Sequence, residues 1–170
     1  LKQKYGDARR TRILAEEKAD FTEEDLIPDQ EVAVALTAKG YVKRLPADTY
    51  RLRRGSRSAE GLAKEDDPVQ LVQQTNMLDT LMAFTNRGRL YQLRVRDLPD
   101  ATRQSRGLPV SNFVQMEEGE RVAALVPTRN LGEGSYFVLV TRGGEAKRVA
   151  SADYTSARGS GVIAIHLAEG

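Results

Sequence analysis

The sequence predicts an all-β, propeller-like fold built from about three repeats. The pattern Thr-x-x-Gly occurs at residues 37–40, 85–88 and 141–144, and its glycines lie 48 and 56 residues apart. Each copy follows an apolar run and precedes a strand-like segment that carries basic residues. A recurring unit of this length is typical of propellers and stacked repeats. Short strands at regular spacing, with turn signals between them, indicate an all-β domain.

We divide the chain into a connector at residues 1–29, leading from an upstream core domain, and a partial propeller at residues 30–170. The connector is short and helical or extended: Gly6 suits a helix end, and Pro28 interrupts the acidic stretch that follows. The repeats span roughly residues 30–78, 79–133 and 134–170. The chain has no start Met, and propellers usually have about four to eight blades. We therefore expect a fragment of a longer protein with further repeats.

Each repeat is expected to contain an apolar strand before the turn, a basic strand after it, and an apolar strand beyond a loop with Arg-Gly. The expected strands are 31–36, 41–45 and 69–74 in the first repeat, 79–84, 89–95 and 108–114 in the second, and 136–140, 145–149 and 162–167 in the third. Residues 31–36 are apolar on both faces, as in a central strand. Arg54-Gly55, Arg106-Gly107 and Arg158-Gly159 take related places in the loops.

Composition excludes several classes of function. No apolar run reaches 18 residues, so no membrane span is predicted, and there is no cysteine for disulfide or thiol chemistry. This composition is compatible with the cytoplasm, where we expect the protein. The single histidine, His166, is expected to face outward from a strand, and the acidic turn at residues 65–67 lacks the ligand spacing of a cation site. Without a nucleophile elbow or a phosphate loop, we predict neither a catalytic residue nor a metal site in this chain.

Positive charge recurs with the repeats. The net charge of the chain is only +2, but residues 31–61, 86–107 and 142–158 carry +4, +4 and +2, separated by acidic segments. If the repeats stack or circle, these segments form one basic stripe. Lys and Arg also protect exposed strand edges from aggregation, but that role explains scattered charges better than periodic ones. The stripe predicts binding of a polyanion, and we favour the phosphate backbone of bent duplex DNA.

Four stretches stand out beside the repeats: Arg53-Arg54-Gly55-Ser56-Arg57 and residues 4–11, 40–44 and 158–165. Together they resemble the C-terminal domain of the DNA gyrase A subunit, and the resemblance covers essentially the whole chain. It implies a β-pinwheel, in which propeller-like blades exchange a strand with their neighbours. It also implies that a basic outer rim wraps duplex DNA, so that the whole enzyme introduces negative supercoils.

The resemblance further implies the partners and cofactors of that whole enzyme. DNA gyrase uses ATP and Mg²⁺, contains the gyrase B subunit together with a second A subunit in a heterotetramer, and cuts DNA with a tyrosine upstream of this chain. This fragment is therefore expected to be non-catalytic and to need no cofactor of its own.

The family's signature box is usually Gln-Arg-Arg-Gly-Gly-Lys-Gly. Residues 52–58 keep the Arg-Arg-Gly and a basic sixth residue, but Leu52, Ser56 and Ser58 depart from the box. Fewer glycines leave the loop less free to adopt positive φ. The A subunit of topoisomerase IV, which has a similar pinwheel with a degraded box, is therefore an alternative. A propeller-like protein-interaction scaffold is another, and it predicts an apolar patch in place of a basic rim.

The candidate DNA-binding residues fall into two sets. The box supplies Arg51, Arg53, Arg54, Gly55 and Arg57. The supporting rim set contains basic residues from all three repeats: Lys39, Lys43, Arg44, Arg87, Arg89, Arg94, Arg103, Arg106, Arg142, Lys147, Arg148 and Arg158. We expect DNA binding that weakens steeply with salt and shows little sequence preference.

Overall fold

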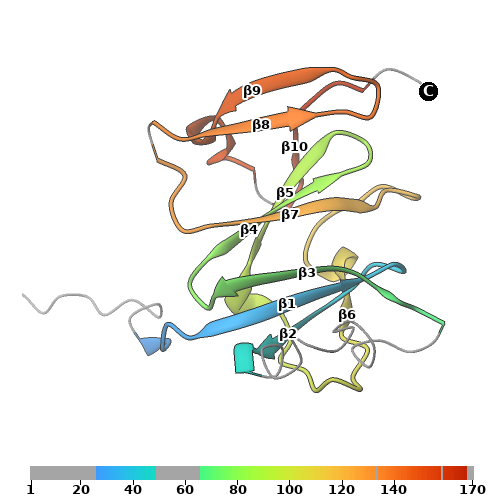
Figure 1. The fold of residues 1–170 in the computed structure, drawn as a ribbon, viewed down its shortest axis with the longest axis vertical. Coiled ribbons are helices and arrows are strands. Elements are labelled where there is room, and N and C mark those ends of the chain that lie inside the picture. The colour runs from blue at the N-terminus through green and yellow to red at the C-terminus, as the bar shows by residue number, and fades with distance from the viewer. Residues whose placement is uncertain (1–25, 49–65, 133, 158, 168–170) are drawn as a thin grey trace, which may run out of the picture.

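The structure is a computed structural model that describes residues 26–48, 66–132, 134–157 and 159–167. Within these ranges, ten strands form three antiparallel sheets, stacked along the long axis of the molecule (Figure 1). The strands are β1 (Glu31–Thr37), β2 (Tyr41–Pro46), β3 (Val69–Asn76), β4 (Thr80–Thr85), β5 (Arg89–Arg94), β6 (Leu108–Pro109), β7 (Val122–Thr128), β8 (Tyr136–Val140), β9 (Ala146–Ala150) and β10 (Val162–Ile163). Short 3-10 helices follow three of them: η2 (Val95–Asp97), η3 (Val110–Asn112) and η4 (Ser151–Tyr154). The all-β prediction is confirmed.

The first two sheets each contain a strand from the following repeat. Their strand orders are β3-β1-β2-β6 and β10-β5-β4-β7, and the third sheet is the β8-β9 hairpin. Strand β6 follows β5 in the chain but pairs with β2, and β10 follows β9 but pairs with β5. We call the first two sheets blade 1 and blade 2. The strand exchange implied by the family resemblance is therefore present in both.

The Thr-x-x-Gly pattern forms the same turn in all three repeats. Gly40, Gly88 and Gly144 have φ values of +83°, +72° and +84°, in the left-handed region that favours glycine. The threonine Oγ1 accepts a hydrogen bond from the amide four residues later, at 3.1 to 3.2 Å. The three turns lie on the same side of the molecule, which we call the turn edge (Figure 1).

Two expected strands are shorter than predicted, and one strand was missed. The strands expected at 108–114 and 162–167 end at Pro109 and Ile163. After Pro109 the chain turns into η3, because the Val110 amide donates to Gly40 O at 2.9 Å and the Val110 side chain enters the core. The sequence analysis predicted no strand at β7, and Pro127 within it argues against a central strand. It is tolerated here because β7 is an edge strand of blade 2.

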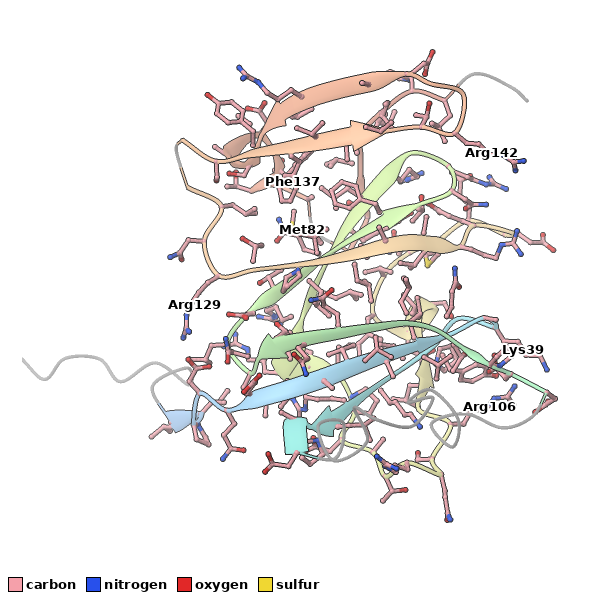
Figure 2. All side chains as sticks on the ribbon, in the orientation of Figure 1. Lys39, Met82, Arg106, Arg129, Phe137 and Arg142 are labelled. Atoms are coloured by element: carbon pink, nitrogen blue, oxygen red, sulfur yellow. The ribbon has the colours of Figure 1, made fainter. Side chains whose placement is uncertain are left out.

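Two core layers lie one on each face of blade 2, and a smaller buried cluster around Ala35 and Leu45 belongs to blade 1. Leu81 and Ala83 of β4 pack toward blade 1, while Met82 packs toward the hairpin. This alternation follows from the two-residue period of a strand. Phe84 and Phe137 meet edge to face with ring centroids 5.6 Å apart, next to Tyr154, and Figure 2 shows Met82 and Phe137 in this layer. Burial of apolar area at both layers holds the three repeats together.

Candidate nucleic-acid interface

Cations from all three repeats gather at the turn edge. Figure 2 labels Lys39, Arg106 and Arg142 on this side of the molecule and Arg129 on the opposite side. Arg87 and Arg89 belong to the β4–β5 turn on the same edge. The repeat geometry thus places basic side chains from blade 1, blade 2 and the hairpin along one side, as the sequence predicts for a stripe.

In blade 2, two arginines share one carboxylate. Arg89 Nη1 lies 2.9 Å from Glu117 Oε1, and Arg87 Nη1 pairs with Glu117 Oε2. Arg87 Nη2 also donates to Glu118 O at 2.6 Å, and Arg89 Nη2 donates to Ser160 O at 2.7 Å. These contacts hold both guanidinium groups side by side at the solvent boundary.

The loop that carries Glu117 is anchored by a buried carboxylate, Glu120. This group accepts hydrogen bonds from Thr85 Oγ1 at 2.6 Å and from the Glu117 amide at 2.9 Å, and the Tyr91 hydroxyl lies 3.0 Å away. Burial opposes ionisation of Glu120, but these hydrogen bonds and the charge of Arg89 outweigh it and lower its pKa. Burial, together with Glu120, raises the pKa of Tyr91 to about 12, so the phenol remains a donor.

Blade 1 repeats this arrangement with different residues. Asp67 accepts hydrogen bonds from Thr37 Oγ1 and the Lys39 amide, both at 2.9 Å. The Lys39 ammonium lies 3.0 Å from Asp66 Oδ2, and this bond holds the pKa of Asp66 below its usual value. Arg106 stacks over the Tyr41 ring, with 4.1 Å from its guanidinium carbon to the ring centroid. Asp66 and Asp67 of the acidic turn therefore support the turn edge through hydrogen bonds.

The hairpin presents its cations most openly. Arg142 lies exposed in the β8–β9 turn, and Arg148 is exposed while it stacks on Tyr136 at 4.3 Å. Lys147 is exposed, and its Nζ donates to Ala164 O at 3.0 Å. All three were predicted rim residues, and all three are accessible.

The rim exposure predicted for Lys43 and Arg44 is wrong. Lys43 is 1% exposed, and its ammonium donates to the carbonyls of Arg103 and Ser105 at 2.8 and 2.7 Å. Arg44 is 7% exposed and contacts Asp100 Oδ1 at 2.8 Å and Val95 O at 3.1 Å. Both side chains bind the connection that runs from β5 to the exchanged strand β6. Burial lowers the pKa of Lys43.

The other predicted DNA-binding residues either lie away from the turn or lie outside the described residues. Arg94 is exposed and pairs with Asp97 at 2.7 Å, and Arg103 is half-buried within the β5–β6 connection. The box residues Arg51, Arg53, Arg54, Gly55 and Arg57 lie outside the described residues, as does Arg158.

Sequence reasoning missed Arg121. It is exposed at the start of β7, where its amide donates to Asn86 Oδ1 at 2.8 Å. With Lys39, Glu117 and Glu118 it lines an open groove of about 640 Å³ between blade 1 and blade 2 at the turn edge. A single arginine in an acidic segment offers no repeat signal, and the register of β7 was needed to place it.

Other classes of site receive no support from the described ranges. No group of three His, Asp or Glu side chains there could hold a metal ion. In the same ranges, no helix has the length and apolar character required to cross a membrane. His166 is exposed, as expected for an outward-facing residue.

Comparison with known proteins gives consistent matches over the whole chain. The chain is 41% identical to the DNA gyrase A subunit of Halalkalibacterium halodurans, across 100% of this chain and 20% of that protein. It is 35% identical to the DNA gyrase A subunit of Dehalogenimonas lykanthroporepellens, across 98% of this chain and 21% of that protein. The chain thus spans about a fifth of the length of the curated relatives it matches.

Several solved structures share the fold. The C-terminal domain of DNA topoisomerase IV matches with a TM-score of 0.62 and 27% identity, over 78% of this chain and 40% of that one. The DNA gyrase A C-terminal domain matches with a TM-score of 0.66 and 24% identity, over 82% of this chain and 45% of that one. A family model described as "DNA gyrase C-terminal domain, beta-propeller" matches residues 32–61, 79–129 and 135–170. The chain belongs to the family of DNA gyrase C-terminal, β-propeller domains.

Proposed function

We propose that this chain is a DNA-binding and DNA-wrapping module of a DNA gyrase A subunit. The observation that carries the proposal is the turn edge, where one repeated turn places Lys39, Arg87, Arg89 and Arg142 along a single side of three stacked sheets. Cations at regular spacing bind phosphates irrespective of sequence, and a row of such contacts offsets the energy of bending duplex DNA. The box residues Arg51, Arg53, Arg54 and Arg57 lie outside the described residues and stay part of the proposed DNA-binding set.

A salt titration tests DNA binding directly. Affinity for a labelled duplex of random sequence, measured by fluorescence anisotropy, should fall with salt with a log–log slope of about −0.9 per phosphate neutralised. Arg142→Ala should reduce the slope by about one contact. Arg129→Ala is the matched control, because Arg129 lies on the opposite side and pairs with Asp29 at 2.6 Å. A slope near zero, or equal losses for both variants, contradicts the proposed surface.

A topology assay tests wrapping. The chain is bound to relaxed plasmid, nicks are closed, and the linking number is measured after protein removal. A positive shift supports a gyrase-type wrap. Binding without a shift favours the alternative, the C-terminal domain of a topoisomerase IV A subunit, which the 27% identity to that solved domain keeps open.

One observation favours an interaction scaffold as a second candidate. Tyr136, Val138 and Val140 form an exposed apolar row on β8, with exposures of 53%, 67% and 73%. Such rows mark surfaces that are covered by protein. If Val138→Ser and Val140→Ser abolish binding of a protein partner but leave DNA binding unchanged, the β8 row acts as an interaction surface that is separate from the proposed DNA-binding surface.

The activity of the whole enzyme is part of the proposal. We infer that the chain acts in the cytoplasm with the gyrase B subunit plus a second A subunit, and that ATP-dependent negative supercoiling belongs to that assembly. Among the described residues, no cluster of three His, Asp or Glu side chains could hold Mg²⁺. We assign this chain the binding role that its turn edge supports and derive no catalytic step from it.

A further inference from the structure

Arg87, Arg89 and Glu117 form a compact anion site that already holds an anion. The two oxygens of the Glu117 carboxylate face different arginines: Oε1 lies 2.9 Å from Arg89 Nη1, and Oε2 pairs with Arg87 Nη1. Two guanidinium groups that converge on one small oxyanion are also the arrangement by which arginines bind phosphate. The carboxylate thus occupies the place that a phosphate oxygen pair would take.

The three side chains can exchange partners with solvent. Their exposed fractions are 45% for Arg87, 28% for Arg89 and 51% for Glu117. Ion pairs this exposed contribute little net stability because water and salt screen them. Arg89 Nε, in addition, is buried without a hydrogen-bond partner among the described residues, so Glu117 does not satisfy this side chain completely.

The backbone beneath Glu117 is held independently of its carboxylate. The Glu117 amide donates to Glu120 Oε2, and the Glu120 carboxylate is itself bound by Thr85 and Tyr91 inside blade 2. The Glu117 side chain can therefore rotate away from the arginines while the loop stays folded. Arg87 also keeps its bond to Glu118 O, and Arg89 keeps its bond to Ser160 O, so the two guanidinium groups remain in place.

We propose that Arg87 and Arg89 form a site for a DNA backbone phosphate, and that Glu117 occupies this site in the free domain and is displaced when DNA binds. This inference rests on the proposed DNA-binding function. It assigns Glu117 an autoinhibitory role: its carboxylate competes with phosphate and sets the affinity of blade 2. The adjacent Glu118 has no such role, because only its backbone carbonyl contacts Arg87.

The test compares two substitutions with the same change in net charge. Duplex affinity of the full chain is measured by anisotropy between about 50 and 200 mM salt, the range over which phosphate contacts dominate. Glu117→Gln should bind about fivefold more tightly than the unmodified chain, because two exposed ion pairs no longer compete. Glu118→Gln should change affinity by less than about twofold. Equal gains in both variants, or no gain in Glu117→Gln, would overturn the proposal.

A double-mutant cycle identifies the arginines as the source of the gain. In a chain that carries Arg87→Ala and Arg89→Ala, adding Glu117→Gln should no longer increase affinity, since the site is absent. A gain that persists in that background contradicts the proposal. Circular dichroism and thermal unfolding of every variant establish that it is folded. If Glu117→Gln is unfolded, titration of the unmodified chain with inorganic phosphate, followed by the NMR signals of the Arg87 and Arg89 side chains, replaces it, and unchanged signals overturn the proposal.

The failure of this inference is distinguishable from failure of the proposed function. If the unmodified chain binds duplex with a steep salt dependence but Glu117→Gln equals Glu118→Gln, DNA binding stands and the Glu117 mechanism is wrong. If neither the unmodified chain nor any variant binds duplex, the DNA-binding function itself fails.

Discussion

Blade 1 and the β8–β9 hairpin carry the same Lys-Arg pair at the same place after the turn, with opposite outcomes. Lys43 and Arg44 are 1% and 7% exposed and donate hydrogen bonds to the β5–β6 connection. Lys147 and Arg148 lie on the surface. The difference comes from the strand that is added next to each pair. Strand β2 is covered by β6 and its preceding loop, whereas β9 pairs with β8 alone among the described strands. A basic residue at this place in the repeat is therefore buried and structural where an exchanged strand covers it, and exposed where none does.

The largest expected effect is on stability. It tests whether the segment that follows the exchanged strand β10 covers the β4–β5 turn and leaves the β8–β9 turn open. A Cβ at Gly88 would lie 2.1 Å from Ile165 O, while a Cβ at Gly144 would meet nothing within 4 Å. Both residues have positive φ, which alone destabilises alanine by about 1–2 kcal/mol. Gly88→Ala should therefore lower the free energy of unfolding by about 3–4 kcal/mol, because the clash adds to the strain. Urea unfolding of Gly88→Ala and Gly144→Ala measures this, and equal losses would contradict a covered turn at Gly88.

The Lys-Arg pairs provide the next largest effect. Lys43→Met removes the donor for two short bonds to carbonyls in the β5–β6 connection, and unsatisfied buried carbonyls should lower the unfolding free energy by about 2–3 kcal/mol. Lys147→Met removes a single bond, to Ala164 O, from an exposed side chain and should lower it by only about 0.5–1 kcal/mol. Thermal and urea unfolding compare them. Similar losses in both variants would show that the hairpin lysine is also structural.

For DNA binding, substitutions in the hairpin pair should have the larger effect and substitutions in the blade 1 pair the smaller one. Arg148→Gln removes an exposed cation and should reduce the salt slope by about 0.9, one phosphate contact. Arg44→Gln, measured where the domain is still folded, should leave the slope unchanged because its guanidinium faces Val95 O and Asp100. Anisotropy titrations over a salt series give both slopes. A loss of slope in Arg44→Gln alone would contradict the assignment of Arg44 as a buried structural residue and Arg148 as a DNA-binding cation.

The smallest effect is the pH dependence that Glu120 gives to blade 2, compared with the hairpin turn. The pKa of Glu120 is lower in the folded chain than its ordinary value of 4.5, so its contribution is present above that pH and is lost as the pH falls through the folded value. Glu120→Gln should flatten the acid side of the stability curve. No described carboxylate accepts a bond from Thr141, so NMR signals at the hairpin turn should change later in an acid titration than those at Thr85. Simultaneous changes would contradict this difference.

Much of the fold was predictable because its signals are local. The Thr-x-x-Gly turns, the strands on either side of them and the double-sided burial of β1 follow from positive φ at glycine and from alternation along a strand. The ends of β6 and β10 were not predictable, because the same apolar pattern suits a strand or a 3-10 turn. No strand was predicted at β7, whose Pro127 is acceptable only at a sheet edge, and edge position is not visible in the sequence.

The sequence alone determined the repeat, its turns, the all-β class and the recurrence of positive charge on one side of the turn. Only the tertiary structure decided which of those charges are free. Glu117 meets Arg87 across 30 residues, and Lys43 meets Arg103 across 60. Such pairings depend on which segment crosses which blade, and strand exchange sends that segment from the following repeat. Composition and periodicity predict where the basic residues occur in the sequence. Long-range packing decides which of them make buried structural contacts and which lie on the surface.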